Sequence, residues 1–519
     1  MRRSLIASIV VTVAAISTIS AGLSLPATAA ADTPSRPNVI VIQTDDQTVA
    51  DLDYMPNVRK LARNGVTFDQ MVTPFAICCP SRAAQLSGAY PHNNGVQGNF
   101  PPDGGFVPWE QNSGDKQIGK WLQDDGYRTV HIGKYINGYA YPNRADATVP
   151  QGWSQWRGSA DPSTYQMWGY RLNGNTPQES KQYGNFRVEN PANYSTDVYR
   201  GLALDAIRDQ KSAASPYYMQ VAFLAPHVET VPLRNGFVPQ DWADVDDPDP
   251  DTGIETISPR PAPRHRNAFP NMPLAKDPSF NEADVSDKGP FIRDLPVLSS
   301  DQIAELKKAN RQRRQSLLAV DEGVGEIVRT LRSTGQYDNT VIVFMGDNGY
   351  MLGQHRISKG KYFPYEPSLR IPFIVSGPGI RKNAHVPDLV SLIDYAPTML
   401  TLTGAQPSGR TPDGISLEPL LRDTGNVTRR SVLLSSGPQR GPNGTMLPQF
   451  DGVRSPHYSW WRYEDGFEEM YDLRRDPFQL TNVASKPAYA NKRNKLIAEW
   501  ERLRDCQGAT CQVRAPGAI

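Results

Sequence analysis

Two pairs of oxygen-bearing side chains stand at the ends of strongly apolar segments. Asp45 and Asp46 end the segment "NVIVIQTDDQ", and Asp347 and Asn348 end the segment "TVIVFMGDNG". Together they offer carboxylate and amide oxygens, which are the donors that Ca²⁺ and Mg²⁺ prefer in proteins. Asp and Asn that follow a strand are also common turn formers and helix caps. Because two such pairs occur, a metal site is as good an interpretation as two turns.

Two lysines and a histidine could act on an anionic substrate beside such a metal. Lys134 follows "YRTVHIG", His227 follows "YYMQVAFLAP", and Lys361 lies in "SKGKYFPYE". A lysine and a histidine near a cation could hold an oxyanion and protonate a leaving group. Taken singly, the lysines are equally typical of an ordinary surface, and the histidine of a core or a loop.

Two of the four cysteines are adjacent, in the segment "AICCPSRAAQLSG". Cys78 could be a thiolate nucleophile with His227 as its base, or a plain buried cysteine. Arg82, four residues later, suits an anionic site. The composition does not choose between these interpretations. The other two cysteines, Cys506 and Cys511 in "CQGATC", could close a small disulfide loop in an oxidising compartment.

The elements that must position these residues follow one pattern, an apolar run and then a polar cluster. Near-continuous apolar runs cover residues 38–43, 127–132, 217–224 and 340–345, with a shorter one beginning near Ile371. Such runs indicate strands buried on both faces, which is the parallel α/β pattern. Ligands of these sheets bind outside the carboxyl ends of the strands. We therefore expect the acidic pairs, Lys134 and His227 to meet at one edge.

Helices are expected between these strands. Ser299 and Gln302 form a capping box that predicts a helix start, and apolar residues with helical spacing run from Leu317 to Leu331. Gly335 is a plausible helix end. Strands and helices in alternation predict an α/β fold with a doubly wound sheet flanked by helices.

The ends of the chain are expected to differ from this core. Arg2 and Arg3, an apolar run over residues 5–15 and small residues ending in Ala29 predict a signal peptide over residues 1–30 rather than a membrane anchor. The mature protein should then be secreted. Residues 36–424 are predicted to form the catalytic α/β domain, with a long irregular insertion at about 228–298. Residues 425–519 are predicted to form a smaller α+β subdomain of short antiparallel strands with a closing helix over 487–503.

The balance of charge excludes two classes of partner. The 519 residues contain 55 Lys and Arg against 54 Asp and Glu, a net charge of +1. A protein that binds nucleic acid or an anionic membrane through bulk charge would show a basic excess. We therefore expect neither nucleic acid nor a membrane as a partner.

The segment "CCPSRAAQLSG" resembles the sulfatase signature Cys-x-Pro-Ser-Arg followed by Leu-Thr/Ser-Gly. The segments "GYRTVHIGKY", "FLAPH", "GDNGYMLGQH" and "MYDLRRDP" follow the order of type I sulfatases from about residue 36 to 485. The chain is thus similar to this family of the alkaline phosphatase superfamily, and the resemblance implies a large mixed, mostly parallel sheet flanked by helices. Its double cysteine and "GKYINGY" most resemble the N-acetylglucosamine-6-sulfatase branch.

The resemblance implies that Cys78 is oxidised to formylglycine by a formylglycine-generating enzyme before the chain folds. It implies a divalent cation, Ca²⁺ with Mg²⁺ as the alternative, held by the modified Cys78 and the two acidic pairs, namely Asp45, Asp46, Asp347 and Asn348. The hydrated aldehyde attacks sulfur and later ejects sulfate. Lys134, His227 and Lys361 match residues that hold sulfate oxygens, one of the last two assists the leaving alcohol, and Arg82 fixes the formylglycine.

One departure from the family pattern concerns the base. Many relatives have Lys-Trp-His where this chain has Lys134, Tyr135, Ile136 and Asn137, and an Asn side chain is no base at neutral pH. We predict a sulfuric ester hydrolase acting on a sulfated sugar, a glycosaminoglycan fragment or an aryl sulfate. The alternatives are a phosphodiesterase or phosphonate monoester hydrolase of the same superfamily, and a non-catalytic sugar-binding relative.

Overall fold

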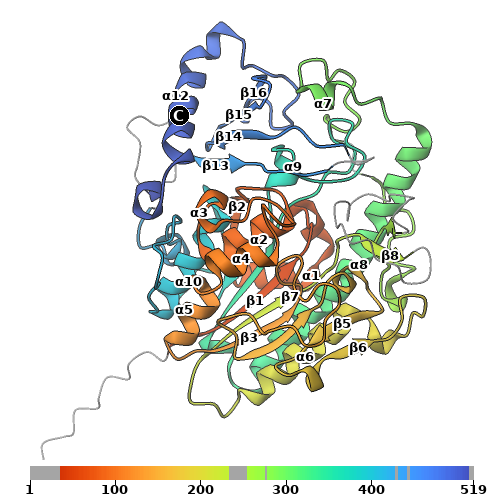
Figure 1. Ribbon diagram of the computed structural model, residues 1–519, viewed down its shortest axis with the longest axis vertical. Coiled ribbons are helices and arrows are strands. Elements are labelled where there is room, and N and C mark those ends of the chain that lie inside the picture. The colour runs from red at the N-terminus through yellow and green to blue at the C-terminus, as the bar shows by residue number, and fades with distance from the viewer. Residues whose placement is uncertain (1–35, 233–253, 275–276, 427–430, 441–444, 513–519) are drawn as a thin grey trace, which may run out of the picture. The chain divides into compact units, whose positions relative to one another are not determined.

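A ten-stranded mixed sheet forms the centre of the protein (Figure 1). The computed structural model describes residues 36–232, 254–274, 277–426, 431–440 and 445–512, so the predicted signal peptide lies outside the described residues. The order across the sheet is β12-β2-β11-β10-β1-β7-β3-β4-β5-β6. The strands are β1 Asn38–Thr44, β2 Gly65–Val72, β3 Arg128–Gly133, β4 Gln155–Ser159, β5 Tyr170–Asn173, β6 Lys181–Tyr183, β7 Tyr217–Ala222, β10 Thr340–Gly346, β11 Phe373–Ser376 and β12 Ala384–Ser391.

The middle of the sheet is parallel. β1 pairs in parallel with β10 on one side and with β7 on the other, and β3 pairs in parallel with β7 and β4. The strand near Ile371, β11, instead runs antiparallel to β10. The predicted mostly parallel, mixed α/β sheet is confirmed, and each central strand lies within two residues of its predicted bounds.

Both faces of the sheet are covered, which explains the continuous apolar runs. Alternate residues of β1 point to opposite sides, so Val39 and Val41 join one core cluster while Ile40 and Ile42 join another. Helices α2 (Cys78–Ser87), α5 (Ile118–Asp124) and α10 (Tyr395–Thr403) contribute to the first cluster. Helices α1 (Pro56–Arg63), α6 (Ser195–Asp209) and α8 (Ser300–Ser333) contribute to the second (Figure 1).

The long helix α8 begins at the predicted capping box. The Ser299 hydroxyl accepts from the backbone N–H of Gln302, and the Gln302 side chain accepts from the backbone N–H of Ser299. The helix ends at Ser333, two residues before Gly335, whose positive φ of 75° suits glycine. Asp321 accepts from the backbone N–H groups of Asn57 and Val58, which fixes α1 against α8.

A second, antiparallel sheet lies near the C-terminus. It has the order β13 (Val432–Ser435), β14 (Phe450–Arg454), β15 (Tyr458–Tyr463) and β16 (Glu468–Asp472), and helix α12 (Ala490–Arg504) follows. Cys506 and Cys511 form the expected disulfide. The described part of the insertion at 228–298 contains the β8–β9 pair (Glu229–Pro232 with Ile254–Ile257) and the short helix α7 (Pro290–Arg293). None of the helices in the described residues is long and apolar enough to cross a membrane.

Candidate active site

The two acidic pairs meet because their strands are neighbours in register. Asp45 and Asp46 follow β1, Asp347 and Asn348 follow β10, and Thr44 lies opposite Gly346. The backbone N–H of Asp46 donates to Asp347 Oδ1 at 3.1 Å. Asn348 Nδ2 donates to Asp46 Oδ1 at 2.6 Å. All four residues are buried, with an exposed fraction of 0%.

The turn that carries Asp46 is held in an unusual backbone conformation. Its φ is 63°, in the left-handed region that Asp tolerates better than most residues. Arg313 of α8 donates to the backbone carbonyl of Asp46 and, at 3.1 Å, to that of Pro226. One buried guanidinium therefore joins the loop after β1 to the loop after β7.

Helix α2 presents Cys78 and Arg82 to the acidic pairs. Cys78 is the first helical residue and Arg82 stands four residues later, so both side chains lie on the same face. Cys78 Sγ lies 3.5 Å from Asp45 Oδ1. Arg82 Nε donates to Asp347 Oδ2 at 2.9 Å, and its Nη2 lies 3.2 Å from Asp45 Oδ2. Arg82 thereby bridges the carboxylates that follow two different strands.

Two lysines approach the same carboxylates. Lys134, the residue after β3, places Nζ 2.5 Å from Asp45 Oδ2. Lys361 places Nζ 2.5 Å from Asp46 Oδ1 and 2.9 Å from Cys78 Sγ. Gly133 makes the turn into Lys134, because its φ is 97° and a Cβ there would stand 2.1 Å from the backbone oxygen of Ala222.

His227 completes the cluster from the loop after β7. Its Nδ1 lies 2.7 Å from the Val228 carbonyl, which can only accept, so Nδ1 carries the proton. Its Nε2 then faces Asp46 Oδ2 at 3.6 Å. The structure thus brings together every residue that the sequence singled out for the site.

Lys361 reaches the cluster through a pairing that the sequence does not reveal. The loop between β10 and α9 (Glu366–Leu369) returns to the segment before α2, where the backbone N–H of Tyr362 donates to the Ala76 carbonyl at 3.0 Å. This isolated bridge sets Lys361 beside Cys78.

The electrostatics favour ionised Asp45 and Asp46 and a neutral thiol. Burial opposes ionisation of Asp45, but nearby Lys134, His227 and Arg82 outweigh it and lower its pKa. For Asp46, Lys361 and His227 likewise overcome burial and lower the pKa. Burial, aided by the charge of Asp45, raises the pKa of the Cys78 thiol well above its usual value. A thiolate nucleophile at Cys78 is therefore disfavoured.

The donor set fits a hard divalent cation. Ligand atoms of Asp45, Asp46, Cys78 and His227 all lie within 4.8 Å of one another. Among the described residues, Asp46 Oδ2 and Asn348 Oδ1 are buried and accept no hydrogen bond. Buried oxygens without donors are costly unless a cation or another donor meets them. The cluster is therefore a possible acidic metal site.

Tyr165 is a residue of the site that sequence reasoning missed. Its ring lies 4.5 Å from Lys134 Nζ and 5.0 Å from the His227 ring. It is buried, with 1% of its surface exposed. It stands in a short 3-10 turn, residues 163–165, and nothing in its neighbourhood in the sequence marks it. Arg313 was missed for the same reason, since the run "RQRRQ" looks like a solvated helix face.

The residues around the double cysteine have separate environments. Cys79 turns into the core cluster that contains Leu86 and Trp109, and burial raises its thiol pKa to about 12. Asn137 is 3% exposed, and its Oδ1 accepts no hydrogen bond from the described residues.

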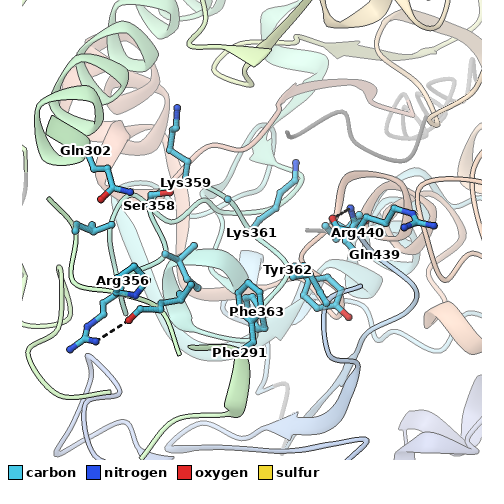
Figure 2. A pocket seen from close by; sticks show the side chains of 17 residues that line it. Phe291, Gln302, Arg356, Ser358, Lys359, Lys361, Tyr362, Phe363, Gln439 and Arg440 are labelled. Carbon is cyan, nitrogen blue, oxygen red and sulfur yellow. Dashed lines mark hydrogen bonds between the residues drawn. The ribbon is translucent and has the colours of Figure 1, made fainter. Parts of the chain in front are cut away.

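A mainly apolar cavity of about 180 Å³ borders the cluster. Ile77, which precedes Cys78, and Lys361 both line it. Figure 2 shows Phe291 and Phe363 stacked against its wall, while the Lys361 side chain extends away from them. Polar groups from several segments complete the lining, among them Gln302, Ser358, Lys359, Gln439 and Arg440.

Comparisons with known proteins identify the family of this chain. A family model described as Sulfatase matches residues 37–405. The chain belongs to the sulfatase family. A second model, described as N-sulphoglucosamine sulphohydrolase, C-terminal, matches residues 353–506 of this sulfatase.

Two curated relatives match nearly the whole sulfatase chain. The arylsulfatase of Volvox carteri is 32% identical, with 94% of this chain and 78% of the relative covered. The N-acetylglucosamine-6-sulfatase of Homo sapiens is 31% identical, with 93% and 87% covered. The predicted family and branch are therefore confirmed. This sulfatase is an enzyme that hydrolyses sulfate esters, and the phosphodiesterase or phosphonate monoester hydrolase alternative is not favoured.

A solved structure shares the fold of this sulfatase. It is described as a protein in complex with its substrate D-glucosamine-2-N,6-O-disulfate, and it superposes with a TM-score of 0.71 at 22% identity. The superposition covers 91% of this chain and 98% of that chain. At this identity the likeness establishes the alkaline-phosphatase-like fold.

Proposed function

We propose that this sulfatase removes sulfate from the 6-position of an N-acetylglucosamine-type sugar. The observation that carries the proposal is the buried cluster in which Cys78, three carboxylates, two lysines and His227 converge at the carboxyl ends of β1, β3, β7 and β10. The identity to the human N-acetylglucosamine-6-sulfatase, spread over most of both chains, supports the choice of sugar.

In this proposal Cys78 is the precursor of the nucleophile. Cys78 Sγ marks the position at which the oxygens of formylglycine would stand, and the hydrated aldehyde would supply both the attacking hydroxyl and an internal route for releasing sulfate. Lys361 Nζ, 2.9 Å from Sγ, would hold a sulfate oxygen next to this position. Lys134 would hold another from the side of Asp45.

The proton for the leaving alcohol has two candidate sources. The Nδ1–H of His227 is held by the Val228 carbonyl, so His227 could deliver a proton only from Nε2, which faces Asp46 Oδ2, and only as the imidazolium, which carries a proton on both nitrogens. Lys361 Nζ contacts the other carboxylate oxygen of Asp46, Oδ1. Either group would donate to the ester oxygen as the bond to sulfur breaks. Arg82 would keep the nucleophile and its carboxylates in place.

We propose that a divalent cation, Ca²⁺ rather than Mg²⁺, is held by Asp45, Asp46, Asp347, Asn348 and the modified Cys78. Such an ion neutralises sulfate charge and acidifies the nucleophilic hydroxyl. Activity lost on treatment with the chelator EGTA should return with Ca²⁺. Full restoration by Mg²⁺ alone would contradict this choice of ion.

The cavity of Figure 2 is proposed to receive the leaving sugar. Its apolar wall suits one face of a pyranose ring, and the amide and ammonium groups of Gln302, Gln439 and Lys359 suit its hydroxyls. We also propose that the protein is exported, on the basis of the signal-peptide pattern at the N-terminus.

The test compares sulfate release from N-acetylglucosamine-6-sulfate with hydrolysis of a phosphate diester by the same preparation. We expect turnover of the sulfate ester and little of the diester. Diester turnover in the absence of sulfate release would overturn the proposal.

A second measurement tests the nucleophile. The tryptic peptide from Asn64 to Arg82 of active enzyme should carry the mass of one cysteine converted to formylglycine. Finding two unmodified cysteines in fully active enzyme would refute the formylglycine mechanism.

A further inference from the structure

Two adjoining hollows lie where α1 and α8 end, at the edge of the sheet opposite the catalytic cluster. The first, of about 510 Å³, is lined by residues of α1 and α8. The second, of about 310 Å³, is lined by the start of β10 and the loop after β11. Asn64, Arg332 and Tyr337 line both, so one extended ligand could occupy the two hollows together.

Basic side chains from three separate segments line these hollows. They are Lys60 and Arg63 of α1, Arg329 and Arg332 of α8, and Lys382 of the loop before β12, and we call this set the basic hollow. All five are exposed. The first hollow has no Asp or Glu among its described lining residues, and the second has Asp338. This gathering stands out in a chain whose net charge is only +1.

The charges of the basic hollow are largely uncompensated. Within the described residues only Arg329 has an ion pair, with Glu326 at 3.8 Å. The Arg332 guanidinium lies 4.3 Å from the centre of the Tyr337 ring. Stacking of this kind holds the planar group in place and leaves its edge for an oxyanion.

A simpler role does not account for the whole set. Lys60, Arg63 and Arg332 stand in the last turns of their helices, where a cation also stabilises the helix dipole. Arg329 lies before the last turn of α8, and Lys382 is not in a helix. Stabilisation of helix ends therefore does not explain why Arg329 and Lys382 line the same hollows.

We propose that the basic hollow binds a sulfated polysaccharide chain at a site separate from the catalytic cluster. β10 runs from Thr340, which lines the second hollow, to Gly346, beside Asp347. A strand of this length spans roughly 20 Å, so a ligand in the hollow cannot be the residue under hydrolysis. Guanidinium groups match sulfate and carboxylate oxygens, and the hollows suit more than one sugar.

The choice of a sulfated saccharide over another polyanion rests on the proposed function. If the catalytic site acts on sulfated sugars outside the cell, sulfated polysaccharide is the polyanion that this chain meets. The basic hollow would then keep the enzyme on its polymeric substrate between successive hydrolyses, and it would act on polymers but not on small sulfate esters.

The test uses heparin as the sulfated polysaccharide and binding as the readout. The variant Lys60→Gln, Arg329→Gln, Arg332→Gln removes three charges from the basic hollow. The control Lys211→Gln, Lys486→Gln, Lys495→Gln removes three charges from exposed lysines elsewhere. We expect the first variant to bind heparin about tenfold more weakly, with a shallower dependence on salt, and the control to match the parent protein.

The remaining outcomes separate this proposal from the proposed function. Turnover of a small aryl sulfate should be the same in all three proteins, because no catalytic residue is changed. Equal heparin affinity in the two variants would overturn the proposal, even if sulfate turnover is found. Retained heparin binding with no sulfate turnover would overturn the proposed function alone. Equal binding of single-stranded DNA, or of polyphosphate, and heparin to the hollow would overturn the assignment to sulfated saccharides.

Discussion

Cys78 and Cys79 are adjacent in the sequence, but their side chains lie in different environments. Cys78 starts α2 and faces Asp45 and Lys361, whereas Cys79 turns into an apolar core cluster. Both thiols have raised pKa values because both are buried. Neither is therefore a reactive thiolate as encoded, and only Cys78 stands where a modified side chain would meet the cluster.

The corresponding prediction compares two alanine variants. Cys78→Ala should abolish sulfate release while the protein stays folded. Cys79→Ala should keep most of the activity and lose about 1 kcal/mol of unfolding free energy, because it removes one buried sulfur. Sulfate release and thermal unfolding measure the two effects. The reverse pattern of activity would mean that Cys79 is the working residue.

Tyr165 carries a second prediction at this scale. Its ring contacts both Lys134 and His227, so it should position the two groups without touching the reacting atoms. Tyr165→Leu should lower kcat/KM by up to about thirtyfold, since a cation–π contact of a desolvated lysine is worth about 2 kcal/mol. It should also move the pH profile of kcat/KM. Tyr165→Phe keeps the ring and should stay near the parent value.

Two outcomes would contradict a positioning role for the Tyr165 ring. If Tyr165→Leu and Tyr165→Phe lose activity equally, the hydroxyl rather than the ring matters. If Tyr165→Leu leaves both kcat/KM and its pH profile unchanged, the ring has no positioning role.

At the scale of elements, the sequence predicted the parts of the site that directly follow strands. A strand buried on both faces leaves a near-continuous apolar run, and the polar residues after it must lie at the sheet edge, as Asp45, Lys134 and Asp347 do. Lys361 and Tyr165 could not be placed in this way. They reach the cluster through an isolated backbone bridge and a short 3-10 turn, which leave no periodic pattern. The reversed direction of β11 was likewise invisible, because an apolar run carries no information on strand direction.

Helix α8 supports a prediction about the loops after β1 and β7. Arg313 is buried and donates to the carbonyls of Asp46 and Pro226. Arg313→Met would leave both carbonyls without this donor, which should cost about 2 to 3 kcal/mol of unfolding free energy and most of the activity. Arg311→Met is the matched control, because Arg311 is half-buried and makes one long bond, 3.5 Å, to the Pro270 carbonyl. Equal unfolding midpoints in urea for the two variants would contradict a stabilising role for the Arg313 hydrogen bonds to Asp46 and Pro226.

The C-terminal region supports a prediction about folding. We propose that residues 425–519 form a subdomain that cannot be removed, because it shares its core with the catalytic domain. Val72 and Tyr90 pack in one cluster with Val432 and Trp460. A chain ending at residue 424 should therefore be insoluble or lack cooperative thermal unfolding. A soluble, cooperatively folded truncated chain would show that the catalytic domain is independent.

At the scale of the whole molecule, two buried groups change the free energy of unfolding with pH in opposite directions. Burial lowers the pKa of His131 from 6.5 to about 3. The unfolded state therefore binds the proton first as the pH falls below 6.5, and the free energy of unfolding decreases from there down to about pH 3. Burial raises the pKa of Asp161 from 3.8 to about 6, although the hydrogen bond from the backbone N–H of Gly138 opposes the shift. Between pH 4 and 6 the native state therefore binds more protons at Asp161 than the unfolded state does, and this group lowers the free energy of unfolding as the pH rises.

Replacing Asp161 by Asn isolates its effect on global stability. The amide keeps an oxygen for the backbone N–H of Gly138 but cannot ionise. Since one pKa unit corresponds to about 1.4 kcal/mol, Asp161→Asn should be more stable than the parent protein by up to about 3 kcal/mol at pH 8. The gain should vanish near pH 4, where the parent carboxyl is largely protonated in the native state. Urea unfolding at both pH values measures this difference, and a gain of the same size at pH 4 would mean that relief of buried charge is not its source.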